Sequence, residues 1–178
     1  MRKIVAGLHM SLDGVISSPE KWSFDYYCDE IGQSIKSRRD ATDTLLFGRN
    51  MYQEFAAIWP GQSGEVADFM NNTPKLVAST TLTSLDWAGA TLIDGDVVAA
   101  LTALKQQPGR NITITGSATL VRSLVRAGML DELHLTICPI VLGSGKRLFD
   151  DRDGRVPLKL AGSEAFPTGV VHLTYQPA

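Results

Sequence analysis

The size and charge of the chain exclude several classes of protein. It has 178 residues, 44% of them hydrophobic and 20% charged, with a formal net charge of −2 at pH 7. This length suits a single domain over residues 1–178, and the near balance of charges gives no basis for binding nucleic acid or an anionic membrane. No apolar run reaches transmembrane length. Cys28 and Cys138 lack a disulfide or metal spacing, so we expect reduced thiols in a cytoplasmic protein and assign no metal.

The first strand is predicted over residues 3–10, an almost continuously apolar run typical of a strand covered on both faces. We therefore expect it at the centre of a sheet, with His9 as a hydrogen-bonded core residue. The turn that follows contains Asp13, which either closes an Asx-type turn or contacts a ligand. A helix is predicted from Asp25 to about Thr42, with Asp25 as a candidate N-cap.

The middle of the chain alternates short strands with helices. Strands are predicted at residues 44–47, 75–78 and 91–93, and helices at 51–58 and 97–104. Asp96 is the expected N-cap of the second helix, and Pro-Gly pairs end both helices. The stretch 61–72 is polar, and no helix or strand is predicted there.

Residues 111–149 predict a strand, a glycine turn, a helix and a second strand. The turn is Gly116-Ser117-Ala118, and Gly128 suits the end of the helix. A turn without bulky side chains lets backbone N–H groups at a helix start approach an anion, and a phosphate is the expected ligand. Close packing between the helix and the sheet would explain the same turn.

Three junctions at strand ends carry residues suited to anions, namely Gly48-Arg49, Ser79-Thr80 and Gly116-Ser117-Ala118. In a mostly parallel sheet these junctions lie at one edge, because right-handed crossovers place all strand carboxyl ends together. This favours an extended ligand such as a dinucleotide, although the Rossmann and P-loop spacings are absent. An antiparallel pair of strands is predicted at 158–161 and 170–175. The expected fold is a three-layer α/β domain whose mostly parallel sheet has an antiparallel C-terminal edge.

Six motifs are spread over almost the whole chain. They are 11–16 (SLDGVI), 46–54 (LFGRNMYQE), 75–79 (KLVAS), 114–118 (ITGSA), 131–136 (DELHLT) and 143–149 (GSGKRLF). With these motifs in this order, the chain resembles the dihydrofolate reductase fold family. More specifically, it resembles stand-alone proteins similar to the reductase domain of the riboflavin-biosynthesis deaminase-reductase, the RibD C-terminal domain. The zinc-deaminase motif is absent from the sequence.

The resemblance implies NADPH as hydride donor and a pterin-like or (ribosylamino)pyrimidine-like heterocycle as acceptor, such as dihydrofolate or 5-amino-6-(5-phosphoribosylamino)uracil. It also implies a set of cofactor-binding residues. Gly48, Arg49, Asn50, Gly116, Ser117 and Ala118 would hold the phosphates, Ser79 and Thr80 the adenosine 2′-phosphate region, and Ala6 and Ile16 would flank the nicotinamide. Such a site mainly positions the reacting carbon of the cofactor against the substrate.

Two carboxylates are candidates for work on the substrate. Asp13 is the candidate for a polar substrate contact, and Asp25 is a candidate proton source, with water as the alternative. After a second glycine turn, Lys146 and Arg147 either meet an anionic substrate tail or are simply exposed.

One departure from the family keeps a different class of function open. In riboflavin-pathway reductases a lysine usually follows the Asp-Gly of the first loop, whereas Val15 stands there in this chain. The alternative is a non-catalytic homodimer that binds a nucleotide or another ligand and derives from such a reductase. A homodimer is also expected from the family and from the apolar strand 133–138.

Overall fold

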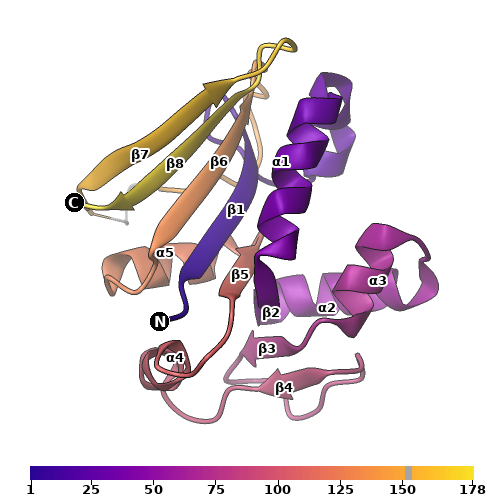
Figure 1. Cartoon of the computed structure of the whole chain (residues 1–178), viewed down its shortest axis with the longest axis vertical. Helices are drawn as coiled ribbons and strands as arrows, with labels where there is room; N and C mark the ends of the chain where they lie inside the picture. The colour runs from indigo at the N-terminus through magenta and orange to yellow at the C-terminus, as the bar shows by residue number, and fades with distance from the viewer. Residues whose placement is uncertain (151–153) are drawn as a thin grey trace.

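The structure, a computed structural model, describes residues 1–150 and 154–178 (Figure 1). The strands are β1 (Ile4–Ser11), β2 (Thr42–Gly48), β3 (Lys75–Ala78), β4 (Ala90–Leu92), β5 (Asn111–Thr115), β6 (Glu132–Cys138), β7 (Leu158–Ala165) and β8 (Val171–Pro177). The helices are α1 (Asp29–Asp40), α2 (Arg49–Ile58), α3 (Glu65–Asn72), α4 (Val97–Lys105) and α5 (Ala118–Arg126). Single 3₁₀ turns lie at Pro19–Lys21, Phe24–Tyr26 and Trp59–Gly61.

The strands form one sheet in the order β4-β3-β2-β5-β1-β6-β8-β7. Neighbours from β4 to β6 are parallel, whereas β8 is antiparallel to both β6 and β7. The first strand therefore lies in the middle of the sheet, between β5 and β6. The mostly parallel sheet with an antiparallel C-terminal edge is the fold predicted from the sequence. Because β1, β2, β3 and β5 are parallel, their carboxyl ends lie at the same edge.

Helices cover both faces of this sheet and make the three layers visible in Figure 1. On one face, Ala6 of β1 packs in a core with Leu101 of α4 and Val121 of α5. On the other face, Phe47 of β2 packs with side chains of α2 and α3, and Ile31 of α1 packs near the end of β6. Side chains alternate along each strand, so a residue of β1 faces one helical layer and its neighbour faces the other.

The first helix begins later than predicted. Residues Phe24–Tyr26 form a 3₁₀ turn, and α1 starts at Asp29 with Cys28 in the N-cap position. The extended backbone of Tyr27 separates the two, because a residue with a ψ of 142° cannot continue a helix. The prediction that Asp25 caps this helix is therefore wrong, and its side chain is exposed in the 3₁₀ turn.

Helix α3 occupies most of the stretch for which no helix was predicted. It buries Ala67 and Met70, and Glu65 in its first turn forms ion pairs with Lys36 and Arg39 of α1. A helix of eight residues depends on such tertiary contacts more than on its own propensity, which explains why the local sequence did not indicate it. By contrast, Asp96 caps α4 as predicted, since its carboxylate accepts a 2.8 Å hydrogen bond from the Ala99 N–H.

The apolar strand considered for a dimer interface is used inside the chain. Leu133 and Leu135 of β6 belong to the core beneath α4 and α5, and Cys138 packs on the opposite face near α1. β6 is itself paired on both sides, by β1 and β8. A homodimer would therefore need another surface. The sheet ends in the edge strands β4 and β7, and most residues of β7 are exposed.

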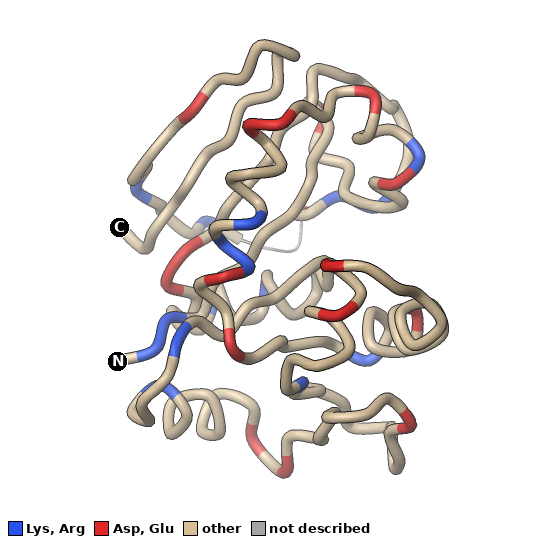
Figure 2. Tube along the Cα trace, turned by 45° about the vertical axis from the view of Figure 1, so that its right-hand side comes forward, with Lys and Arg blue, Asp and Glu red and all other residues tan. Residues whose placement is uncertain are grey.

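Charges of both signs are scattered along the trace (Figure 2), so any attraction for an anionic ligand has to come from local groups. In residues 1–150 and 154–178, no helix combines the length and the apolar character needed to span a membrane.

Lys75 is a buried cation within the core around β3. Its side chain is 1% exposed. The ammonium group donates hydrogen bonds of 2.8–3.1 Å to the carbonyl oxygens of Asn71, Thr73 and Ala88, and it lies 4.5 Å from the centre of the Trp87 ring. These contacts tie the end of α3 to β3 and to the loop before β4. Lys75 is thus a structural residue, and burial lowers its pKa from 10.5 to about 8.

We expect Lys75→Met to lower the free energy of unfolding at pH 7 by about 2 kcal/mol, because it leaves buried carbonyl groups without donors. The pKa of Lys75 is lower in the folded state than in the unfolded state, so unfolding takes up a proton between about pH 8 and 10.5. The free energy of unfolding of the wild type should therefore increase as the pH rises through that window, and Lys75→Met should lack this increase.

Urea denaturation at several pH values measures both effects, with exposed Lys21→Met as the control. Equal stability of Lys75→Met and wild type would contradict the structural role.

Candidate functional site

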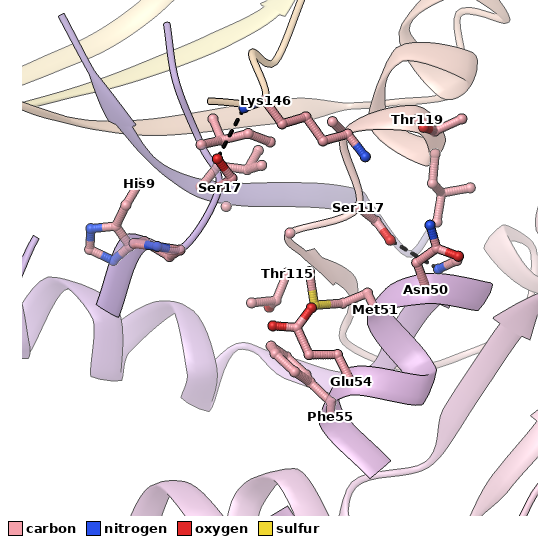
Figure 3. A pocket seen from close by; sticks show the side chains of 18 of the residues that line it. His9, Ser17, Asn50, Met51, Glu54, Phe55, Thr115, Ser117, Thr119 and Lys146 are labelled. Atoms are coloured by element: carbon pink, nitrogen blue, oxygen red, sulfur yellow. Dashed lines mark hydrogen bonds between the residues drawn. The ribbon is translucent and has the colours of Figure 1, made fainter. Parts of the chain in front are cut away.

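A cleft of about 690 Å³ opens at the edge where the parallel strands end (Figure 3). Its walls include the ends of β2, β3 and β5, the first turns of α2 and α5, and residues after β1. A volume of this order falls within the range of small-molecule and cofactor sites.

The cleft brings together seven of the twelve residues singled out from the sequence. These seven are Ile16, Gly48, Arg49, Asn50, Gly116, Ser117 and Ala118. The five that do not line it are Ala6, Asp13, Asp25, Ser79 and Thr80.

Two helices start at this cleft without a side-chain cap. Gly48 is the N-cap residue of α2 and Ser117 that of α5, and neither offers a side-chain hydrogen bond to its helix. The first backbone N–H groups of α2 and α5 therefore have no partner within the helix. Helices α1 and α3 also lack a side-chain cap but do not start at this cleft, and Asp96 caps α4. Uncapped N–H groups and the positive ends of two helix dipoles make this region suited to anions.

One hydrogen bond links these two helix starts. The Gly48 N–H donates to the Ser117 hydroxyl oxygen at 3.1 Å, which joins the end of β2 to the turn after β5. Gly116 and Ser117 both have positive φ angles, of 72° and 55°, and this backbone turns the serine toward β2. The φ of 72° favours a glycine at position 116, and a Cβ atom there would lie 2.2 Å from the Met51 methyl carbon, so the methionine side chain would have to move.

Arg49 lies beside the loop after β3. Its guanidinium donates hydrogen bonds to the Thr81 hydroxyl at 3.1 Å and to the Asn50 side-chain oxygen at 3.2 Å. Ser79 is engaged within its own loop, where its hydroxyl accepts from the N–H groups of Thr81 and Leu82. Thr80 is exposed. The second junction predicted from the sequence thus lies next to Arg49, at the margin of the cleft.

Ala6 does not line the cleft. It is fully buried in the core beneath α4 and α5, whereas the neighbouring residues Gly7, Leu8 and His9 contribute to the cleft wall. A continuously apolar strand carries no alternation that would indicate which residues face which layer, so Ala6 could not be distinguished from its neighbours by sequence pattern.

Asp13 fastens two loops to each other. Its carboxylate accepts hydrogen bonds from the Ser11 hydroxyl at 2.6 Å and from the N–H groups of Leu142 and Gly143 at 3.1 and 2.9 Å. The Arg147 guanidinium donates to the Asp13 carbonyl oxygen at 2.9 Å. The hydrogen bonds to the carboxylate, that from Ser11 first, lower the pKa of Asp13 from 3.8 to about 2. Asp13 is thus ionised and held by the loop contacts.

The same two loops continue to pair toward the cleft. Val15 is buried and forms an antiparallel bridge with Arg147, and the Lys146 N–H donates to the Ser17 hydroxyl at 3.0 Å. A Cβ at Gly145 would lie 2.5 Å from a Val15 methyl carbon, which shows how closely the loops approach. Arg147 is on the outside, whereas the Lys146 side chain extends over the cleft toward Ser117 and Asn50 (Figure 3).

His9 and Glu54 line the cleft, although no sequence pattern indicated them as site residues. The Glu54 carboxylate points into the cleft beside Met51 (Figure 3). The prediction of a hydrogen-bonded core histidine is wrong for His9, because its buried Nδ1 has no partner among the described residues. A single polar residue near the end of an apolar strand was the available signal. Across residues 1–150 and 154–178, no three His, Cys, Asp or Glu side chains are grouped as metal ligands.

Comparison with known proteins places the chain in a family. The RibD C-terminal domain family matches residues 2–172. The uncharacterized protein YyaP of Bacillus subtilis (strain 168) is 29% identical over 98% of this chain and 94% of its own length.

Two solved structures share the fold. A protein from Shewanella sp. PV-4 named for riboflavin biosynthesis has a TM-score of 0.77 at 22% identity, over 100% of this chain and 99% of its own. Dihydrofolate reductase from Enterococcus faecalis, solved in complex with NADP(H), has a TM-score of 0.65 at 16% identity, over 98% and 95% of the two chains. With nearly its whole length matched, the chain belongs to the RibD C-terminal domain family and has a dihydrofolate reductase-like fold.

Proposed function

We propose that this protein is an NADPH-dependent reductase that transfers a hydride to a pterin-like or (ribosylamino)pyrimidine-like heterocycle. The observation that carries the proposal is the pair of uncapped helix starts, joined by the hydrogen bond between Gly48 and Ser117 at one cleft. Two helix N-termini that each favour an anion, placed in one cleft, suit a ligand with two linked phosphates. Membership in the RibD C-terminal domain family and the shared fold with an NADP(H)-bound dihydrofolate reductase support the same cofactor.

The residues of the cleft fit such a cofactor. Backbone N–H groups at Asn50 and Ala118, in the first turns of α2 and α5, are the proposed donors to its phosphates. Arg49, with Ser79 and Thr80 in the adjoining loop, is proposed to meet the adenosine 2′-phosphate. When bound, NADPH supplies the hydride, and the chain supplies orientation and a local field.

The nicotinamide end of the cleft is proposed to lie against Ile16. Its side chain lines the cleft and belongs to the loop that Asp13 fastens. Ala6, the other residue considered for this role, is fully buried in the core against which Ile16 packs, and it does not line the cleft, so it is proposed to act through the backbone of β1. A cofactor carbon held against Ile16 would be positioned by an apolar surface, which excludes water from one side of the reacting atom.

The substrate side is proposed to depend on positioning more than on acid catalysis. Asp13 holds the loop that carries Lys146, and Lys146 is the cation available to an acidic substituent of the substrate. Asp25 is exposed in its 3₁₀ turn and does not line the cleft, which favours water over Asp25 as the proton source. Glu54 is a carboxylic acid that does line the cleft.

A non-catalytic homodimer that binds a nucleotide or ligand is the second candidate. The observation that favours it is Val15, which is 1% exposed beneath the 143–147 loop and presents no cation to the cleft. This candidate predicts cofactor binding without oxidation of NADPH by any dihydropterin or aminopyrimidinone, and a dimer in sedimentation experiments.

We expect the wild-type protein to bind NADPH, and Arg49→Ala to weaken that binding about tenfold, because a charge-assisted hydrogen bond to phosphate is lost. Titration with quenching of the tryptophan fluorescence measures both affinities, and NADH titrated in parallel gives the cofactor preference. Arg155→Ala, an exposed arginine outside the cleft, is the matched control. Unchanged NADPH affinity in a folded Arg49→Ala protein would contradict the phosphate site.

We expect Asp13→Asn to lower kcat/KM with little change in NADPH affinity, since the loop that carries Lys146 loses its anchor. Amide hydrogen exchange at Leu142 and Gly143 should become faster, because their N–H groups donate to the Asp13 carboxylate. With its pKa lowered to about 2, this anchor is in place above about pH 4 and is lost as the pH falls through 2.

Asp25→Asn separates the roles of the two carboxylates. With water as the proton source, its kcat should equal that of wild type at every pH. A tenfold or larger fall in kcat, with protein stability preserved, would instead establish Asp25 as the proton source.

A further inference from the structure

The three histidines of the chain lie in neighbouring strands, and two of them are fully engaged. His172 of β8 lies 3.1 Å from His134 of β6, and its other ring nitrogen lies 3.2 Å from the Thr136 hydroxyl. His134 also contacts the Glu132 carboxylate at 3.1 Å. These contacts account for both nitrogens of each ring, so His134 and His172 are structural parts of the sheet.

His9 differs from the other two histidines. Its Nδ1 is buried and has no hydrogen-bond partner among the described residues, although most buried polar atoms in folded proteins have one. Its strand neighbour in β6, Thr136, uses its hydroxyl on His172 instead. The ring is only partly buried, and it lines the cleft.

The surroundings of His9 keep its ring neutral. Burial and the nearby Arg38 guanidinium both lower the pKa of His9. Arg38 also contacts the Nε2 atom of His172 at 3.2 Å, and an arginine can only donate, so that nitrogen of His172 accepts. With this cation beside it, His9 is a poor proton source. As a neutral imidazole it has one donor nitrogen and one acceptor nitrogen, so it can form hydrogen bonds of either direction.

The position of His9 in the cleft separates it from the anion-suited region. Figure 3 shows His9 and Ser17 on one side of the cleft, and Asn50 and Thr119 on the other. The helix starts that suit phosphates are on the Asn50 side. A ligand part near His9 would therefore be the part that lies farthest from the phosphates.

We infer that His9 is a specificity-determining residue of this cleft, whose neutral imidazole hydrogen-bonds the polar edge of the bound heterocycle. The inference rests on the proposed function and names the residue that selects the substrate. Pterins and aminopyrimidinones carry amide-type N–H and C=O groups along one ring edge, and a neutral imidazole can pair with either group. An apolar ring of similar size offers no such partner and is rejected, because the imidazole would stay unpaired.

A purely structural histidine would behave differently on substitution. If His9 served the fold, its replacement by leucine would lower stability. A binding residue with an unpartnered polar atom predicts the opposite, because leucine removes that atom while filling a similar volume. His134→Leu is the matched control, since it removes a histidine whose nitrogens are hydrogen-bonded within the sheet and which lies outside the cleft.

The test uses the full chain labelled with ¹⁵N in its histidine rings. The His9 ring signals are assigned by their absence in His9→Leu, and pterin and 5-aminouracil are titrated as probes in the presence of NADP⁺. We expect the probes to shift the ring ¹⁵N signals of His9 and to leave those of His134 and His172 in place. His9→Leu should bind the probes about tenfold more weakly, the loss expected for one hydrogen bond, with a Tm equal to or above that of wild type. His134→Leu should lose Tm and keep its probe affinity within twofold.

Several outcomes would overturn the inference. They are probe binding with unmoved His9 signals, a His9→Leu protein with lower Tm and unchanged probe affinity, and no probe binding to wild type. Titration of the same samples with NADP⁺ measures cofactor binding, and this tests the proposed function separately. Without NADP⁺ binding the reductase proposal fails, whereas a probe that still shifts His9 would uphold the role of this residue.

Discussion

The hydrogen bond from the Gly48 N–H to the Ser117 hydroxyl is the contact on which the cleft depends. It holds the ends of two neighbouring strands together, and each strand leads directly into a helix. The serine hydroxyl accepts this hydrogen bond from β2 and makes no capping hydrogen bond to α5. The left-handed backbone of Gly116 and Ser117 produces this arrangement. The left-handed backbone of Ser117, which is costly for a residue other than glycine, therefore occurs where two helix starts meet at the cleft.

The sheet face beneath α1 imposes a second constraint on the molecule. It carries a chain of polar contacts through Glu132, His134, His172 and Arg38, whereas the opposite face is a continuous apolar core. Burial and the Arg38 cation lower the pKa of His172 to about 4, so this network is built around a neutral imidazole at pH 7. The network explains why a long polar helix packs over this part of the sheet. It also sets the electrostatic surroundings of His9, which shares the Arg38 cation.

The features of the fold that depend on residues close together in the sequence were predictable from the sequence. The Asp96 cap, the glycine turn at Gly116 and the alternation of β6 depend on residues a few positions apart, and all three follow the prediction. Helix α3 did not, because its stability comes from α1 and from the core. The placement of Asp13 was equally inaccessible, since two of its hydrogen-bond donors lie about 130 residues further along the chain.

The orientation of β1 shows most directly why site residues were harder to predict than the fold. Its apolar run correctly indicates a central strand, but a strand covered on both faces has no alternation, so its register has to come from the neighbouring strands. With that register, Ala6 falls in the core beneath α5 and His9 falls at the cleft.

The candidate chemistry follows from this geometry. Asp13 and Asp25 both lie outside the cleft lining, whereas Glu54 lines it. Burial, and after it the Arg38 cation, lower the pKa of His9. Carbon–hydride transfer needs a donor and an acceptor carbon held in contact more than it needs an acid in the protein. A cleft with anion-suited helix starts on one side and a neutral hydrogen-bonding ring on the other is consistent with that requirement. In the proposed reductase the side chains of the cleft would then select and orient the reactants.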